Sequence, residues 1–243
     1  MLSKQLISQI KSLDKKKFRD EYGLFVAEGK KLVTELSSIL KIQKIYSLSN
    51  NDIENVEVIS EQDMKRISFL KNPSSMLGIF HIPKHGNLDQ PLPSEPVFAL
   101  DDIQDPGNLG TIIRLCDWFG IKTLICSSHT ADCYNPKVIQ ATMGAIARVK
   151  VIYLDLAQYL NTAVKKNIPV FGTFLNGSNI YNSELSPQGI IVLGNEGNGI
   201  SKEVENTISH RLYIPSFSKE TASESLNVAI AAAIVCSEFK RRG

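Results

Sequence analysis

The amino-acid sequence predicts an α/β protein: a mostly parallel sheet with helices on both faces, preceded by a small α/β unit. From Val97 onward, short apolar runs alternate with stretches of helical periodicity, which is the pattern of parallel strands joined by helices. Before that region lies a stretch rich in proline and poor in apolar residues, 83–96, which favours a solvated connection. We therefore expect an N-terminal domain over 1–84, a linker over 85–96 and a second domain over 97–243.

The first domain is expected to alternate helices and strands. It opens with an amphipathic helix, because apolar residues recur at helical spacing at Leu2, Leu6, Ile10 and Leu13. A basic block follows, diluted by acidic neighbours, which contains Lys15, Lys16, Lys17 and Arg19. The expected strands are 23–27, 42–48, 56–59 and 76–82, and the expected helices are 29–40 and 61–70.

The second domain supplies the main sheet. Its expected strands are 97–103, 123–126, 149–154, 169–175, 189–193 and 211–214, with helices between most of them and a long helix from about Ser225 to Lys240. The carboxyl ends of parallel strands meet at one edge of a sheet, where open α/β sheets bind their ligands. A binding site is therefore expected in the loops that follow these strands.

The loop after strand 189–193 is the most informative of these. Its sequence, Gly194-Asn195-Glu196-Gly197-Asn198-Gly199, has three glycines, which allow sharp turns and leave backbone amides open to a ligand. It matches neither the phosphate-binding P-loop nor the dinucleotide fingerprint. Glycines alone are equally compatible with an ordinary strand-to-helix turn, but an acidic side chain in such a loop indicates a donor nearby. Ser201 is a candidate cap for the following helix.

Two further segments carry candidate functional residues. After strand 97–103, Asp105 and Pro106 are a suitable N-cap and first position for a helix on which Arg114 lies off the apolar stripe. Arg114 is either a surface residue paired with Asp117 or a phosphate-binding guanidinium. Near the end of the chain, Pro215 stops a strand, and Ser225 or Asn227 is able to cap the last helix. We expect the amide of Asn227 to contact another loop.

Together these segments resemble the three motifs of the SpoU (TrmH-type) RNA ribose methyltransferases. The matching stretches are Asn108-x-Gly110-x-x-x-Arg114, Leu193-Gly194-Asn195-Glu196-Gly197-x-Gly199, and Ile214-Pro215 with Ser225-Leu226-Asn227. The N-terminal stretches Lys15-Lys16-Lys17-Phe18-Arg19 and Phe25-Val26-Ala27-Glu28-Gly29 resemble the RNA-substrate-binding domain that often precedes this catalytic domain. The third motif departs from the family, because 216–224 is long and Ala229 stands where serine is frequent.

The resemblance implies a fold and a chemistry that periodicity does not give. It implies a C-terminal trefoil knot, which is a rare exception to the rules of chain connection, a homodimer, and S-adenosylmethionine as cofactor. The implied cofactor-binding residues are Thr173, Gly194, Asn195, Gly199, Ile214 and Leu226. The implied catalytic residues are Arg114, Asn108, Glu196, Ser225 and Asn227, and the implied RNA-binding residues are Lys15, Lys16, Lys17 and Arg19.

The implied reaction is transfer of a methyl group from a sulfonium to a ribose 2′-hydroxyl, in rRNA more than in tRNA. An arginine is a poor general base, so Arg114 is expected to engage the RNA phosphate and the 2′-oxygen. Glu196 is expected to fix Arg114 or Asn108. Two alternatives remain: a non-catalytic RNA-binding or ribosome assembly factor, and a base methyltransferase on a related scaffold. A dehydrogenase is the least favoured class, since its fingerprint is absent.

Composition excludes several other classes. The chain has 243 residues and a net charge of +2, so any basic surface has to be local. Its four cysteines show no C-x-x-C pairing, so neither a metal site nor a disulfide framework is expected. We expect these cysteines to be reduced thiols in a cytoplasmic protein. Lysines from Lys4 onward interrupt any signal-peptide pattern, and the longest apolar run, 228–236, is too short for a membrane span.

Overall fold

The computed structural model describes residues 1–50, 52–83, 96–186, 188–218 and 225–242. The chain forms two compact units. The first is built from Met1–Asn87 and Asp132–Ala147, and the second from Leu88–Ala131 and Arg148–Gly243. The segment Asp132–Ala147, which lies inside the range expected for the second domain, therefore packs with the first unit.

The first unit has a four-stranded mixed sheet in the order β1-β4-β2-β3. Strand β4 is antiparallel to β1 and to β2, whereas β2 and β3 are parallel. The strands are β1 (Leu24–Glu28), β2 (Ile42–Ser47), β3 (Val56–Val58) and β4 (Met76–His81). The helices are α1 (Lys4–Ser12), α2 (Lys16–Tyr22), α3 (Lys30–Ser37), α4 (Glu61–Ile67), α6 (Pro136–Thr142) and the 3₁₀ turn η1 (Ala145–Ala147).

Both faces of this sheet are covered. On one face Ile10 of α1 and Ile67 of α4 pack against a core that includes Val26 of β1. On the other face Phe25 of β1 stacks on Phe80 of β4 with 5.7 Å between ring centroids. Tyr134, from the segment that precedes α6, adds a ring 5.0 Å from Phe25. Segment 132–147 thus completes the apolar packing around β1.

The second unit has a six-stranded sheet in the order β10-β8-β9-β5-β6-β7, and every neighbouring pair is parallel. The strands are β5 (Val97–Asp101), β6 (Thr123–Ser127), β7 (Lys150–Leu154), β8 (Val170–Asn179), β9 (Ile190–Gly194) and β10 (His210–Tyr213). A short 3₁₀ turn, η2 (Ile180–Asn182), follows β8. The predicted parallel α/β sheet is confirmed.

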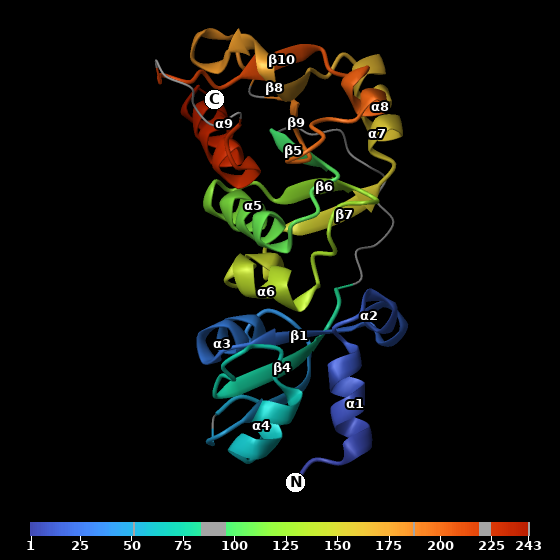
Figure 1. Cartoon of the computed structure of the whole chain (residues 1–243), viewed down its shortest axis with the longest axis vertical. Helices are drawn as coiled ribbons and strands as arrows, with labels where there is room; N and C mark the ends of the chain where they lie inside the picture. Colours follow the sequence, from blue (N-terminus) through green and yellow to red (C-terminus); the bar gives the residue numbers. More distant parts are fainter. Residues whose placement is uncertain (51, 84–95, 187, 219–224, 243) are drawn as a thin grey trace. The chain divides into compact units, whose positions relative to one another are not determined.

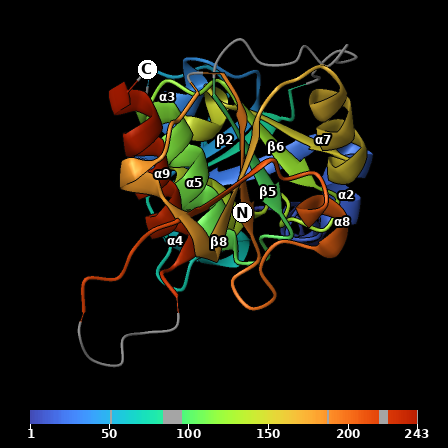
Figure 2. The same ribbon diagram turned by 90° about the horizontal axis from the view of Figure 1, so that it is seen from above.

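Helices cover both faces of this sheet, as the sequence predicts. Helices α5 (Pro106–Trp118) and α9 (Val228–Arg242) lie on one side, and α7 (Leu156–Lys165) and α8 (Lys202–Glu205) on the other (Figures 1 and 2). Because the sheet is parallel, the carboxyl ends of β5, β8, β9 and β10 lie along the same edge. The loops named in the sequence as candidates for a site leave from this edge.

The expected elements differ from the structure mainly at their ends. Helix α4 stops at Ile67 rather than continuing to Leu70, because the buried carboxylate of Glu28 accepts hydrogen bonds from the Ser68 hydroxyl (2.5 Å) and the Phe69 amide (2.9 Å). Helix α2 occupies the basic block, where no helix was expected. The expected linker, 85–96, lies outside the described residues except at its last position.

Three features of composition can be compared with the structure. All four cysteines are free and buried. In the part of the chain that the structure describes, no helix has the length and apolar character needed to cross a membrane. Within the same residues, His, Cys, Asp and Glu side chains form no group of three or more that could hold a metal ion.

Candidate active site

The glycine-rich loop after β9 folds back on itself. The amides of Asn195 and Gly199 each donate to the carbonyl of the other, at 3.0 and 2.9 Å. A Cβ on Gly194 would lie 2.4 Å from the backbone of Gly199, so only glycine fits there. Gly199 itself has φ +69°, a left-handed conformation that favours glycine. The sequence composition of the loop therefore follows from its geometry.

Asn195 sets the shape of this loop from inside. Its Oδ1 accepts hydrogen bonds from the amides of Gly197 (2.9 Å) and Asn198 (3.0 Å), which is a local turn that asparagine makes well. Its Nδ2 donates to the carbonyl of Asp102 at 2.7 Å, which ties the loop to the end of β5. The side chain of Glu196 is thereby presented at the surface of the sheet edge.

Asn108 joins three segments that are far apart in the sequence. Its Nδ2 donates to Oε1 of Glu196 at 2.5 Å, and its Oδ1 accepts from Nδ2 of Asn227 at 2.9 Å. Oδ1 of Asn227 in turn accepts from the amides of Ala229 and Ile230 at the start of α9. Of the predicted catalytic residues, the structure brings Asn108, Glu196 and Asn227 together.

Two helix starts hold this arrangement in place. Oδ1 of Asp105 accepts from the amide of Asn108 at 2.8 Å, with Pro106 at the first helical position, so the predicted N-terminus of α5 is confirmed. Asn227 both caps α9 and contacts another segment through its amide nitrogen. Ser201 stands at the start of α8 but makes no side-chain cap; its backbone amide donates to Asp101 instead.

Arg114 is exposed on α5, six residues along the helix from Asn108. The expected alternative, a surface pair with Asp117, is wrong, because Asp117 accepts bidentate hydrogen bonds of 2.8–3.0 Å from Arg148. Among the described residues, Arg114 has no hydrogen bond or ion pair to a side chain. Its guanidinium is available for an anion from outside the protein. Ser225 is also exposed, next to Leu226.

The residues that the resemblance assigns to a cofactor lie along the carboxyl edge of the sheet. Thr173 lies where the pairing of β8 with β10 is interrupted. Gly172 pairs with Arg211, and the next pair along the strands is Ser178 with Leu212. Ile214 directly follows β10, and Leu226, which is 50% exposed, precedes α9. A Cβ added at Gly199 would meet no other atom within 4 Å, so this side of the loop is open. Backbone amides, one hydroxyl and apolar side chains suit an uncharged adenosine group better than a phosphate.

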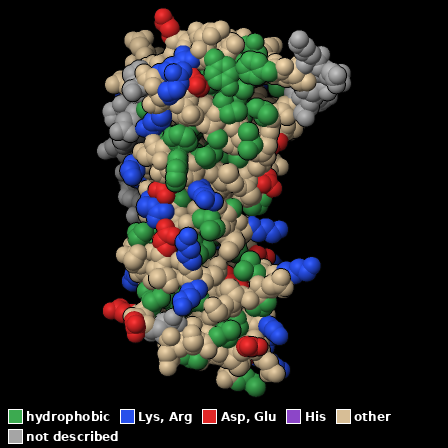
Figure 3. Space-filling model, turned by 90° about the vertical axis from the view of Figure 1, so that its left-hand side faces the viewer, with side chains coloured by type: hydrophobic (Ala, Val, Ile, Leu, Met, Phe, Trp, Pro, Cys, Tyr) green, Lys and Arg blue, Asp and Glu red, His purple; other side chains and the backbone are tan. Residues whose placement is uncertain are grey.

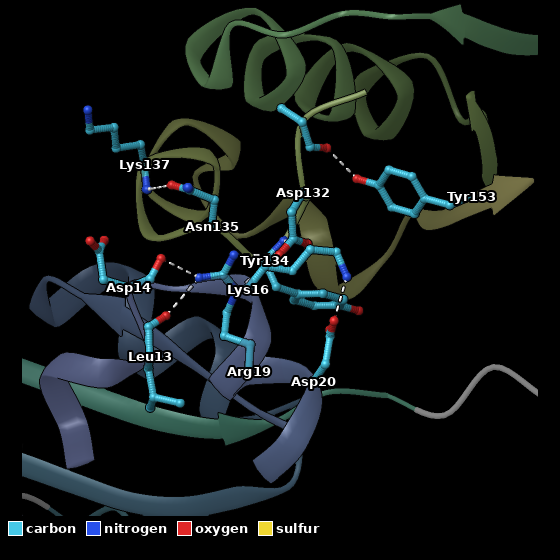
Figure 4. A network of polar contacts seen from close by, with 11 residues as sticks. Leu13, Asp14, Lys16, Arg19, Asp20, Asp132, Tyr134, Asn135, Lys137 and Tyr153 are labelled. Atoms are coloured by element: carbon cyan, nitrogen blue, oxygen red, sulfur yellow. Dashed lines mark hydrogen bonds and ion pairs between the residues drawn. The ribbon is translucent and has the colours of Figure 1, made fainter. Parts of the chain in front are cut away.

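The predicted RNA-binding residues differ in their surroundings, as Figure 4 shows for Lys16 and Arg19. Lys15, Lys16 and Lys17 are exposed, and Lys16 pairs with Asp20 at 2.6 Å. Arg19 is 2% exposed, and its guanidinium donates to the Asp132 carboxylate and to the carbonyls of residues 13 and 14. The prediction that Arg19 binds RNA is therefore corrected: its donors are used inside the protein.

Two residues next to the site were missed by the sequence reasoning. Asp101, 5% exposed at the end of β5, accepts from the amide of Ser201 at 2.7 Å. Asp102 follows it with a left-handed backbone, φ 60°. A pair of acidic residues directly after an apolar strand was the available signal.

The buried thiols of Cys116 on α5 and Cys236 on α9 are not candidates for the reaction. Burial raises the pKa of Cys236 to about 12 and that of Cys116 further. Neither is a nucleophile.

Both parts of the chain match known protein families. A family model described as the SpoU rRNA Methylase family matches residues 95–237. A second, described as the MRM3-like substrate binding domain, matches residues 4–78. The 23S rRNA (guanosine(2553)-2'-O)-methyltransferase RlmP of Bacillus subtilis is 29% identical over 240 residues, with 95% of this chain and 94% of that protein covered.

Solved structures match over the full length. A protein of the TrmH family from Porphyromonas gingivalis is 39% identical, with a TM-score of 0.88 and 100% of both chains covered. An AdoMet-bound rRNA methyltransferase from Sinorhizobium meliloti is 28% identical, with a TM-score of 0.85 and coverage of 100% of this chain and 96% of that one.

Proposed function

The chain belongs to the SpoU rRNA methylase family, and we propose that it transfers a methyl group from S-adenosylmethionine to a ribose 2′-hydroxyl of ribosomal RNA. The relatives support both parts of this proposal. The Bacillus subtilis protein is named as a 23S rRNA guanosine 2′-O-methyltransferase. The Sinorhizobium meliloti protein is described as an rRNA methyltransferase with AdoMet bound. Ribosomal RNA is for this reason preferred to tRNA.

The hydrogen bonds that Asn108 makes are the observation that carries the proposal. They join Glu196 and Asn227 to Asn108 at one sheet edge, although these residues are 88 and 119 positions away from it in the sequence. An ordinary strand-to-helix turn needs no such connection. A reaction between two bound molecules does need its protein groups held at fixed positions.

The cofactor would be held at the carboxyl edge of the sheet. The residues whose chemistry suits an adenosine group are Thr173, Gly194, Asn195, Gly199, Ile214 and Leu226. The bound cofactor supplies a methyl group already activated on a sulfonium sulfur, so the protein mainly has to align the acceptor and assist loss of its proton. Ser225 and Asn227 would orient the loops around this site.

Arg114 would be the residue that engages the RNA. Its exposed guanidinium is suited to bidentate contact with a phosphate and to a hydrogen bond with the 2′-oxygen. Since an arginine side chain stays protonated, Arg114 alone is a poor base, and proton removal would depend on the phosphate that it holds. Glu196 would act by fixing Asn108.

The N-terminal part would bind RNA outside the reacting nucleotide. We propose that residues 1–84 form the substrate-binding domain, 85–96 the linker and 97–243 the catalytic domain, which the family matches to 4–78 and 95–237 support. The exposed Lys15, Lys16 and Lys17 would contact phosphates, while RNA shape selects the nucleotide. We also propose a cytoplasmic location.

A homodimer and a C-terminal trefoil knot are also part of the proposal. Figure 3 shows hydrophobic side chains gathered on the side of the second unit that carries α5 and α9. Trp118 of α5 is 84% exposed and Ile230 of α9 is 53% exposed. Since these two helices pack against each other, their outer side chains would form one surface that a second copy covers.

Sedimentation should show a dimer for the wild type and monomers for Ile230→Lys, while Val164→Lys on the opposite face leaves the dimer intact.

The deciding experiment measures transfer of labelled methyl from S-adenosylmethionine to rRNA and tRNA taken from cells that lack this protein. Label should appear in the rRNA and be recovered as a 2′-O-methylnucleoside. Arg114→Ala should lower the rate about a hundredfold or more, because it removes charged hydrogen bonds to the transition state. Thr111→Ala, an exposed neighbour on the same helix, is the matched control.

The other outcomes separate the alternatives. Label recovered on the base would indicate a base methyltransferase. Absence of both cofactor binding and label would indicate an RNA-binding or assembly factor, and full activity of Arg114→Ala would remove Arg114 from the reaction.

A further inference from the structure

Asp102 has an unusual backbone at the edge of the candidate active site. Its φ of 60° places it in the left-handed region, where residues with a side chain are strained. It follows β5 directly and is partly buried. A residue held in such a conformation persists only where its surroundings fix it, and such residues concentrate at functional sites.

The amide of Asp102 is fixed from the end of β6. It donates to Oγ of Ser127 at 2.9 Å. That hydroxyl lies 3.1 Å from Oγ1 of Thr130, which reaches the carbonyl of Leu100 at 3.3 Å. Ser127 and Thr130 are both buried, so this support is shielded from water.

The carbonyl of Asp102 points the other way, at the glycine-rich loop. It accepts the 2.7 Å hydrogen bond from Nδ2 of Asn195, whose Oδ1 holds the amides of Gly197 and Asn198. The far end of the loop is held separately, by the bond from the Ser201 amide to Asp101. With an extended backbone at Asp102, its amide and its carbonyl would not both keep these partners.

We propose that Asp102 is a positioning residue: its left-handed backbone, fixed by Ser127, sets Asn195 and through it the loop that binds the cofactor and presents Glu196. This rests on the proposed methyltransferase function. Asp102 acts through its backbone. Its carboxylate is therefore dispensable, whereas its left-handed backbone conformation is required.

Two substitutions separate conformation from side chain. Asp102→Gly keeps the left-handed backbone at no steric cost, whereas Asp102→Val, being β-branched, disfavours it. By calorimetry, the Kd for S-adenosylmethionine should stay within about threefold of wild type in Asp102→Gly and rise about tenfold or more in Asp102→Val. The amides of Gly197 and Asn198 should exchange hydrogen faster in the valine variant only.

Asn167→Val is the matched control, because Asn167 also has a left-handed backbone, φ 57°, on an exposed position of the same unit. It should lower the melting temperature and leave the Kd unchanged. Should Asp102→Val not fold, Ser127→Ala tests the same support by removing the acceptor of the Asp102 amide, and it should raise the Kd several-fold.

The proposal is overturned if Asp102→Val or Ser127→Ala binds the cofactor as wild type does, or if Asn167→Val weakens binding equally. A wild-type protein that binds no S-adenosylmethionine would instead overturn the proposed function, so the two failures are distinguishable.

Discussion

The side-chain amide of Asn108 has its orientation set by its neighbours. Oδ1 of Asn227 accepts two backbone amides, so its Nδ2 has to donate, and Asn108 has to receive that bond with its oxygen. The nitrogen of Asn108 is then left to donate to Glu196. Glu196 is therefore needed as a hydrogen-bond acceptor. This role does not require its carboxylate to transfer a proton.

This direction of hydrogen bonding predicts different outcomes for two substitutions at Glu196. Glu196→Gln keeps an acceptor oxygen and should lower kcat less than about tenfold, because a neutral acceptor is roughly half as strong as a charged one. Glu196→Ala removes the acceptor and should cost about ten- to a hundredfold, from the loss of a charged hydrogen bond. Steady-state methyl transfer measures both. A glutamine variant as inactive as the alanine variant would mean that Glu196 transfers a proton.

At the scale of elements, helix α2 is anchored by an arginine rather than by apolar residues. Arg19 is the one buried side chain of this helix, and its guanidinium reaches Asp132, 113 positions along the sequence. Figure 4 shows it enclosed between the end of α1 and the segment before α6. A charge buried this deeply is stable only with its partner.

A double-mutant cycle on Arg19 and Asp132 tests this anchor. Arg19→Met alone should lower the free energy of unfolding by about 3 kcal/mol or more, since it leaves the Asp132 carboxylate without its partner. With Asp132→Ala, the cycle should give a coupling of about 1–3 kcal/mol. The exposed pair Lys16–Asp20 is the control and should couple by about 0.5 kcal/mol or less. Equal coupling for the two pairs would contradict a structural role for Arg19.

The N-terminus and α4 are joined by a carboxylate whose pKa is shifted. Burial by itself would raise the pKa of Asp63, but the Leu2 amide, the N-terminal charge, Ser60 and Arg66 lower it below its usual value. Because the folded-state pKa is lower than the unfolded value of about 3.9, the stabilisation is complete above about pH 5 and is lost as the pH falls through the folded pKa.

Comparison of the wild type with Asp63→Asn checks this sign. The wild type should be the more stable at pH 7, and the difference should shrink as the pH falls below about 4 toward the lowered pKa of Asp63. Denaturant unfolding at a series of pH values measures it. A difference that stays constant over this range would show that Asp63 contributes no charge-dependent stability.

At the scale of the whole molecule, the two compact units do not follow two continuous stretches of sequence. The second stretch leaves its own sheet at Ala131 and returns at Arg148, and between these points it packs with the first unit. Residues that pack in one core open together, so we expect Asp132–Ala147 to unfold with residues 1–83.

Native-state hydrogen exchange tests this division of the chain. Leu36→Ala, at a fully buried position of α3, should destabilise the first unit by about 2–5 kcal/mol and speed exchange in α6. Leu160→Ala, at an equally buried position of α7, should speed exchange in β8 and β9 and leave α6 unchanged. If α6 responded to Leu160→Ala instead, segment 132–147 would belong to the second unit.

The sequence by itself determined the elements and the positions of the loops at the candidate site. Apolar periodicity placed the strands of both sheets, and the glycines and asparagines at 194–199 indicated a tight loop. These features depend on neighbours in the sequence, since a strand or a turn is specified by side chains a few positions apart.

Only the tertiary structure decided which partners the polar side chains take. Glu196 contacts Asn108 and not Arg114, Asp117 contacts Arg148, and the basic-looking Arg19 is buried against Asp132. In each case the partner lies tens of residues away, so the choice depends on how whole strands and helices are placed. A hydrogen bond requires donor and acceptor within about 3 Å, and no local pattern in the sequence carries distances of that kind.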